Sequence, residues 1–349
     1  MKLETKIAYL ILCLALPLTT ACKKTPIPAE DPQPAEVAFA ASSQATWVKT
    51  TTGEEQPEFP YDNFGVWGIA RQEGLLAPYV LWGTNSLMLV KEDEDVFVPS
   101  EAAYWLKGYT YNFLAVAPFF EDDKGFNLTP ISPSTSSGED VMTFAFDISN
   151  RYKNGKYDFD LLGAADQTYV DKGGYNTAQE LTFWHLLSQI EIKSISFASG
   201  INGTVNKIVL KSFPSATYTI SYDNGSNNST KPTGVSCNSI TQKSNGESAD
   251  KVEATFLNPD FSVSHPVVNI IPQAVANLEL YIDFTITQNA IEDKYKDFKI
   301  NLNTQNLTEY VYNGKYNWSI TIGARNAITF DVTATPWQDV NVPDEYPLT

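Results

Sequence analysis

The sequence has few of the residues that most often carry catalytic or metal chemistry. Its 349 residues include only two histidines, His185 and His265, and three cysteines, Cys13, Cys22 and Cys237. His185 lies in an apolar stretch, which is typical of a core histidine with one satisfied ring nitrogen, and no cluster of histidines and carboxylates has metal-ligand spacing. The sequence also lacks a Gly-x-Ser-x-Gly elbow, a Walker loop and a His-Glu-x-x-His motif. We therefore predict no catalytic residues, no metal site and no cofactor.

Positive charge is also scarce. Lysine and arginine total 24 against 41 aspartates and glutamates, and the net charge is −17, or −18 once residues 1–21 are removed. Because phosphate binding requires a basic face, this balance excludes nucleic acid as a partner. The acidic runs at 92–95 and 121–123 are typical of solvated turns, although counting carboxylates leaves a glycosidase pair open.

The apolar run at the N-terminus is short. Residues 7–18 are fewer than the ~20 that a membrane-spanning helix needs. They follow Lys2 and Lys6 and precede a group of small residues, so we predict a signal peptide over residues 1–21. The stretch Leu18-Thr19-Thr20-Ala21-Cys22 resembles the lipobox of bacterial lipoproteins, which implies lipid attachment at Cys22. An ordinary signal peptide followed by an incidental cysteine is the alternative.

The remaining chain divides by composition. Residues 22–36 hold four prolines and almost no large apolar residue, which indicates a stiff, extended tether. Residues 167–179 are polar and contain glycine, and they are our candidate domain boundary. We therefore predict an N-terminal domain over 37–175 and a C-terminal domain over 176–349. With Cys13 removed and Cys22 acylated, Cys237 stands alone, so we expect no internal disulfide.

Strands with polar turns dominate both halves. Residues 109–117 (YTYNFLAVA) read as a central strand, because both of its faces become apolar towards the end. Apolar runs recur at short intervals between asparagine, glycine and proline turns, which is typical of β-sandwiches. Residues 181–197 fit a strand, and their first part also fits a short helix.

The last hairpin has the clearest pattern. Trp318, Ile320 and Ile322 alternate with polar residues, and Ile328, Phe330, Val332 and Ala334 alternate again after a turn. Alternation with a period of two on both sides of a turn indicates two paired strands with one buried face. The tail over 338–349 has two prolines and little alternation, which makes it a poor strand by itself. The final strand could therefore pair within its own chain or insert into another molecule.

Aromatic residues of the first half allow a different interpretation. A sugar-stacking surface could form from Trp67, Trp82, Trp105, Tyr109 and Tyr111. The competing interpretation is that these rings pack in the core or on a sheet face.

Several stretches, taken in order behind the lipobox, resemble the fimbrillin family of surface lipoproteins of Gram-negative bacteria. They are residues 64–68, 109–118, 157–164, 181–190, 270–273, 316–320 and 336–337. The resemblance implies an all-β fold of two transthyretin-like β-sandwich domains in tandem. It also implies export to the outer membrane as a lipoprotein, removal of the first strand by a trypsin-like protease, and insertion of a neighbour's strand into the emptied groove.

On this resemblance the chain is a non-enzymatic structural or adhesive subunit, stalk or tip, of cell-surface fimbriae. Lys49 is the only basic residue between the first strand-like stretch (37–39) and Phe64, so we predict cleavage after Lys49. The candidate donor strand contains Ala327, Ile328, Phe330, Val332 and Ala334. Expected partners are other fimbrial subunits, the outer membrane through the lipid, and a host protein or glycan. The alternatives are an uncut anchor lipoprotein and a surface glycan-binding lipoprotein.

Overall fold

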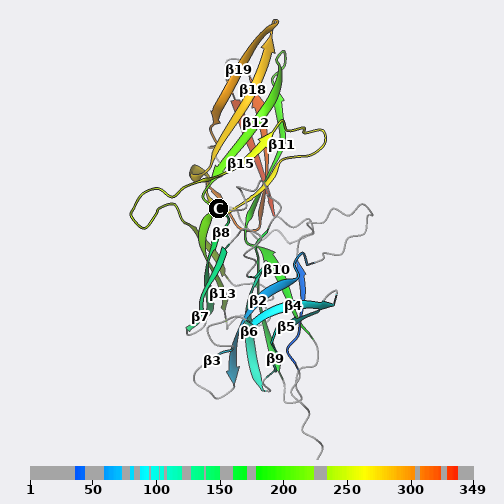
Figure 1. Ribbon diagram of the computed structural model, residues 1–349, viewed down its shortest axis with the longest axis vertical. Coiled ribbons are helices and arrows are strands. Elements are labelled where there is room, and N and C mark those ends of the chain that lie inside the picture. Colours follow the sequence, from blue (N-terminus) through cyan, green and yellow to red (C-terminus); the bar gives the residue numbers. More distant parts are fainter. Residues whose placement is uncertain are drawn as a thin grey trace, which may run out of the picture. The chain divides into compact units, whose positions relative to one another are not determined.

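The computed structural model describes residues 36–43, 59–72, 79–81, 87–93, 96–101, 103–105, 108–119, 127–136, 139–149, 160–170, 178–223, 234–302, 307–323 and 328–336. These residues form 22 β-strands and one short 3₁₀-helix, η2 (Val275–Asn277). The prediction of an all-β fold is therefore confirmed (Figure 1).

The largest sheet closes on itself. Pairing runs from β2 through β4, β5, β1, β10, β9 and β6 back to β2, and β3 lies beside β2. All of these pairs are antiparallel except the parallel pair of β1 and β10. The strands are β1 (Phe39–Ser43), β2 (Asn63–Gln72), β3 (Tyr79–Val80), β4 (Leu87–Asp93), β5 (Val96–Pro99), β6 (Tyr109–Ala117), β9 (Leu162–Val170) and β10 (Gln179–His185).

A second, four-stranded sheet packs on the closed sheet. Its order is β14, β13, β8, β7, with bounds β7 (Asn127–Ser136), β8 (Glu139–Asp147), β13 (Ser215–Asp223) and β14 (Gly234–Ser239). Phe144 of β8 and Tyr218 of β13 share a core with Trp67 of β2 and Leu114 of β6. The other face of β6 carries Phe113 into a separate apolar cluster. The prediction of a central strand that is buried on both faces is confirmed for β6.

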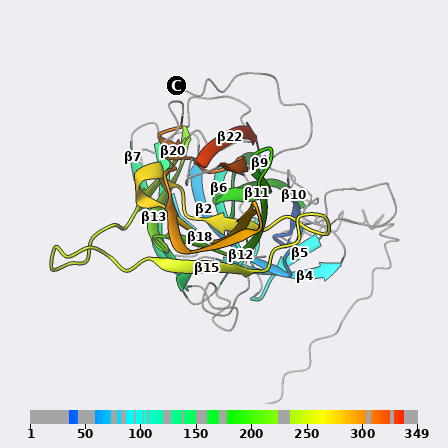
Figure 2. The same ribbon diagram turned by 90° about the horizontal axis from the view of Figure 1, so that it is seen from above.

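Two further four-stranded sheets form the second sandwich (Figures 1 and 2). One has the order β16, β11, β21, β22, and the other has the order β15, β12, β18, β19. Ile192 and Trp318 from the first of these sheets share a core with Leu210 and Ile282 from the second. The bounds are β11 (Ser188–Phe197), β12 (Asn202–Ser212), β15 (Val252–Leu257), β16 (Val267–Ile270), β18 (Glu279–Gln288), β19 (Ile291–Ile300), β21 (Gly314–Ile322) and β22 (Ile328–Pro336).

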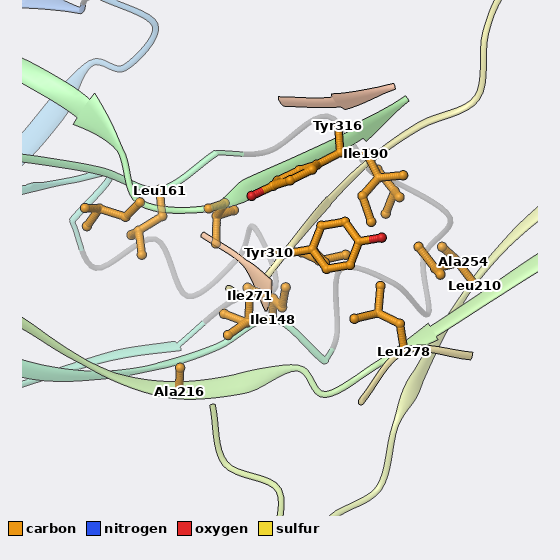
Figure 3. Close-up of a cluster of buried hydrophobic side chains, with 14 of the residues drawn as sticks. Ile148, Leu161, Ile190, Leu210, Ala216, Ala254, Ile271, Leu278, Tyr310 and Tyr316 are labelled. Carbon is orange, nitrogen blue, oxygen red and sulfur yellow. The ribbon is translucent and has the colours of Figure 1, made fainter. Parts of the chain in front are cut away.

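A small two-stranded sheet, β17 (Gln273–Ala274) with β20 (Glu309–Tyr310), brings Tyr310 into this core. Figure 3 shows the Tyr310 and Tyr316 rings among Ile190, Leu210 and Leu278. The two tyrosine rings meet edge to face, with centroids 4.6 Å apart. Burial raises the pKa of both hydroxyls, so both stay protonated at neutral pH.

The predicted boundary at residues 175 and 176 separates strands that pair with each other. Strand β10 follows this boundary but pairs with β1 and β9. Strand β13 also follows it, and pairs with β8 from Ser215–Asp147 to Asp223–Glu139. The polar stretch before β10 therefore connects neighbouring strands of one sheet, and the division into two tandem domains stays a prediction. Residues 181–185 lie in β10 and residues 188–197 in β11, so the short helix considered for the first part of this stretch does not form.

Two buried polar clusters lie in this region, and the first of them joins β8 to the closed sheet. The Asp140 carboxylate in β8 is fully buried and accepts hydrogen bonds from Arg71 Nη1 in β2 at 2.6 Å and from Asn112 Nδ2 in β6 at 2.5 Å. His185, at the end of β10, is buried with its Nδ1 against the Asp160 carboxylate. The prediction of a core histidine with one satisfied ring nitrogen is confirmed for His185.

Candidate functional site

Strand β1 occupies an interior place in the closed sheet. It pairs in parallel with β10 from Phe39–Gln179 to Ser43–Phe183, and antiparallel with β5 at Phe39–Phe97. Just before β1, Val37 N–H donates to the Ala103 carbonyl at 2.9 Å. Both edges of this short strand are therefore paired, and its removal would leave β5 and β10 with unpaired backbone groups.

The Phe39 side chain is the centre of the apolar cluster inside this sheet. It is fully buried, and its ring centroid lies 5.1 Å from Phe113, 5.9 Å from Trp105 and 6.4 Å from Phe64. Val37 and Ala41 are also buried. Burial of a phenylalanine contributes about 1.5–3 kcal/mol, so β1 is held by its side chains as well as by its ladder.

The chain is anchored again soon after β1. Phe59 packs against Phe183, with ring centroids 4.8 Å apart, and Tyr61 donates its hydroxyl to the Asp160 carbonyl at 2.7 Å. Along the chain, β1 is therefore joined to the rest of the fold only through residues 44–58. Lys49 belongs to this segment and, like Cys22 in the tether, lies outside the described residues. A cut in this segment would leave β1 attached by noncovalent contacts alone.

The nearest arginine is held within a strand. Arg71 belongs to β2, pairs with Thr110 of β6, and makes an ion pair with Asp140. A protease needs an extended segment that is free of its ladder, so this position does not replace Lys49 as a candidate for cleavage.

Among the strands that the structure describes, β22 is the edge of its sheet and pairs with β21 alone. Phe330, Val332 and Ala334 are partly buried against the core, and the Phe330 ring meets Trp318 at 5.2 Å. The residues that alternate with them, Thr329, Asp331 and Thr333, are exposed. The predicted alternation is confirmed for 329–334. Ala327 lies outside the described residues, and Ile328 is described only by its backbone pairing with Ile322.

The other long edge strands carry features that protect an edge from pairing. Strand β19 has six charged residues and a bulge opposite β18. Strand β7 has two prolines and a bulge opposite β8. Strand β22 is nine residues long, has one charged residue and pairs in continuous register. Among the edge strands that the structure describes, β22 combines length, regularity and low charge most fully, which suits it to pair with a second chain.

The aromatic platform considered for sugars does not form. Trp67, Trp105 and Tyr111 are at most 3% exposed, and Tyr109 packs against the cluster around Phe39. Trp82 lies outside the described residues. Trp67 and Tyr111 are buried because strands β2 and β6 have a packed layer on each face, so these two rings cannot offer a face to a sugar.

The described residues offer little for catalysis. No group of three or more histidines, cysteines, aspartates and glutamates within them could hold a metal ion. A hollow of about 450 Å³ beside η2 is lined by Glu279 and Lys299, but these two side chains form an ion pair at 3.3 Å. Within the same residues no helix has the length and apolar character to span a membrane.

Comparison with known proteins identifies the family. The model of the family described as fimbrillin-like matches residues 52–337, which include all the described strands except β1. The chain belongs to the fimbrillin-like family. The resemblance noted in the sequence is thereby confirmed. No curated protein is similar enough to count as a match.

Solved structures resemble the fimbrillin-like chain over most of its length. A fimbrial protein from Bacteroides vulgatus is 16% identical with a TM-score of 0.49, covering 86% of this chain and 99% of its own. A candidate cell adhesion protein from Bacteroides uniformis is 18% identical with a TM-score of 0.42, covering 86% and 98%. A fimbrial assembly protein from Parabacteroides distasonis is 9% identical with a TM-score of 0.34, covering 86% and 99%.

Proposed function

We propose that this fimbrillin-like protein is a structural or adhesive subunit of cell-surface fimbriae that joins its neighbours by exchanging strands. Family membership supports the role as a fimbrial subunit. The observation that carries the mechanism is the place of β1, which is paired on both edges and centred on the buried Phe39 but joined to the rest of the fold through residues 44–58 alone.

The chain reaches the cell surface through its N-terminus in this proposal. Cys22 carries the lipid that holds it at the outer membrane, and residues 22–36 lift the folded body from the lipid surface. A protease then cuts after Lys49, which frees β1 together with the lipidated segment. The emptied place exposes the edges of β5 and β10 and an apolar slot, and a strand from another subunit restores both by β-augmentation.

The donor in this proposal is the strand around Phe330. Its apolar side chains Ile328, Phe330, Val332 and Ala334 fill the slot, and its backbone completes the ladder. Low charge and regular pairing along β22 support this assignment. A subunit that both accepts and donates forms the stalk, one that only accepts forms the tip, and an uncut one that only donates forms the anchor.

The N-terminus of the protein on intact cells tests this function. We expect Edman sequencing or mass spectrometry to find a surface species that starts at Thr50, and filaments or SDS-resistant ladders that contain it. A Lys49→Gln variant should keep its lipidated N-terminus at Cys22 and lose the ladders. Lys294→Gln is the matched control, because Lys294 is an exposed lysine on β19 that contacts only Glu292 among the ion pairs. Fimbriae built from chains that still begin at Cys22 would contradict the proposed cleavage after Lys49.

A further inference from the structure

An ordered arm of polar residues connects β14 to β15. Residues 240–251 fold back on themselves as a small hairpin, in which the Lys243 N–H donates to the Glu247 carbonyl at 2.7 Å. All the residues from 242 to 248 are exposed. Asn245 and Gly246 lie at the tip of this arm, in the yellow-green loop that leads into β15 in Figure 2. The arm therefore holds an asparagine–glycine step in a fixed turn that faces water.

We propose that the Asn245–Gly246 step is a site of spontaneous deamidation in the folded chain. An asparagine followed by glycine is suited to this reaction, because glycine has no Cβ beside the attacking backbone nitrogen. Two other such steps lie among the residues that the structure describes, at 202–203 and 313–314. The fold leaves the step at the tip of the arm open and closes the other two. This inference does not depend on strand exchange.

The reaction consumes only water. The Gly246 backbone nitrogen bonds to the side-chain carbonyl carbon of Asn245, and the side-chain nitrogen leaves as ammonia together with the proton of the Gly246 amide. Water then opens the cyclic imide. Opening at the former side-chain carbonyl gives aspartate, and opening at the main-chain carbonyl gives isoaspartate, in which the main chain runs through the side chain. Either product adds a negative charge beside Glu247.

Two features of the tip favour ring closure. The Asn245 Oδ1 accepts a hydrogen bond from the Glu247 N–H at 3.1 Å, which holds the side chain against the residues that follow it. The same N–H stabilises the negative charge that develops on Oδ1 during the attack. Gly246 has a φ of +83°, and apart from its chain neighbours no heavy atom lies within 4 Å of the place where a Cβ would stand. The space beside the attacking residue is therefore open.

One contact of the arm opposes the reaction. The Gly246 N–H donates to the Lys243 carbonyl at 2.9 Å, and it must leave this acceptor before the nitrogen can attack. A single backbone hydrogen bond contributes little net stability in water, so an exposed turn releases it at small cost. The rate of deamidation at Asn245 in the folded chain should therefore lie within about tenfold of the rate in the unfolded chain.

The other two steps are restrained by strands. Gly203 belongs to the ladder of β12 with β18, and the Phe197 ring lies against it. Asn313 has a buried Oδ1, and Gly314 is buried at the start of β21. Ring closure rotates the backbone of the asparagine, so these strands would have to open first, and opening of packed strands is costly. In the folded chain both steps should react at least about 100-fold more slowly than Asn245.

Peptide mapping of the aged full chain tests this. Folded chain and urea-unfolded chain are incubated at mildly alkaline pH, digested with trypsin, and searched for the mass gain that exchange of NH for O produces. Cleavage after Lys243 and Lys251 releases residues 244–251, in which Asn245 is the single asparagine, so this peptide reports one site. An isoaspartyl methyltransferase with labelled S-adenosylmethionine detects the isoaspartate product. The 244–251 peptide should convert in both samples, and the peptides that hold the other two steps should convert only in urea.

Variants separate the restraint by the arm from the chemistry. Asn245→Gln should abolish the conversion, because glutamine would have to form a larger ring. Ala249→Pro removes the N–H that donates to the Thr241 carbonyl and loosens the arm without changing the reacting pair, so it should speed the conversion by about two- to tenfold. Ser248→Ala is the matched control, since it removes only a side-chain hydroxyl that donates to the Ala249 carbonyl, and it should react at the rate of the parent.

Two results would overturn the proposal. If the 244–251 peptide stays unconverted in the folded chain over a time in which it converts in urea, the arm protects Asn245. If the peptides with Asn202 or Asn313 convert in the folded chain as fast as the 244–251 peptide, the fold does not select the site. Neither result bears on the proposed exchange of strands, which is tested by the N-terminus of the protein on cells.

Discussion

Phe39 of β1 meets Phe113 of β6 edge to face, with ring centroids 5.1 Å apart and planes at 89°. This contact links the strand we propose to be exchangeable to β6, which pairs along its length with both β2 and β9. It predicts that β1 contributes strongly to the stability of the uncut chain.

Phe39→Ala in the uncut chain should lower the free energy of unfolding by about 3–5 kcal/mol, because it removes a fully buried aromatic side chain. Urea unfolding followed by tryptophan fluorescence would measure the loss. Ala40→Ser on the half-exposed face of the same strand should change stability by no more than about 0.5 kcal/mol. Equal, small effects of both changes would show that β1 is not packed in the core.

Local pattern in the sequence was sufficient to predict the strands but not their partners. The alternation around Trp318 and Phe330 specified a hairpin, and the structure pairs β21 with β22 in continuous register. Hydrophobic alternation specifies which residues face a core, because side chains alternate across a strand. It contains no information on which distant strand lies alongside.

The closed sheet could therefore not be predicted from the sequence. It depends on the parallel pairing of Phe39 with Gln179 and on the antiparallel pairing of β2 with β6, which join residues far apart in the chain. The same limit leaves the domain boundary at residues 175 and 176 a prediction, because a polar stretch between paired strands has the composition of a linker. It also explains the aromatic platform, since single-strand patterns do not reveal that Trp67 and Trp105 are covered.

Asp140 is predicted to be a second determinant of stability. Its buried carboxylate is the acceptor for both Arg71 and Asn112, and it joins β8 to the closed sheet. Asp140→Ala should lower the free energy of unfolding by about 3 kcal/mol or more, since it leaves a partly buried guanidinium and a buried amide without their acceptor.

An exposed ion pair serves as the control for the buried Asp140 cluster. Lys294 and Glu292 lie 2.9 Å apart with their side chains 69% and 54% exposed, so Glu292→Ala should cost less than about 1 kcal/mol. Thermal or urea unfolding of both variants would check the contrast. Equal losses would mean that the buried cluster contributes no more than surface charge.

Glu191 in β11 should make the protein less stable in acid. Burial disfavours its ionised form, but hydrogen bonds from Lys193 Nζ at 2.6 Å and His265 Nδ1 at 2.9 Å outweigh burial and lower the pKa of the carboxyl. A carboxyl with a lower pKa in the folded state stabilises the fold above the unfolded-state pKa of about 4.3. This contribution is lost as pH falls through that value towards the folded-state pKa.

The Glu191→Gln variant should therefore lose stability at pH 7 and show a flatter decline between pH 5 and the acid limit than the parent. Urea midpoints measured at steps of pH would show the difference in slope. Glu247→Gln, on an exposed turn residue, should follow the parent curve. A Glu191→Gln curve parallel to that of the parent would mean that this carboxyl is not stabilised by its neighbours.

Cys237 in β14 should be slow to react, and its reactivity reports on a sheet edge next to the closed sheet. Burial raises the pKa of its thiol to about 12, and the sulfur donates to the Pro272 carbonyl at 3.8 Å. Because the thiolate is the reacting species, a thiol reagent such as dithionitrobenzoate should label the native chain at pH 8 far more slowly than the chain in denaturant. In a chain that starts at Lys23 and so lacks Cys13 and Cys22, a Cys237→Ser variant should give no signal in either state, which assigns the reaction to this residue. Rapid labelling of the native chain would instead show that β14 opens readily, and that β22 is not the edge most available to a partner.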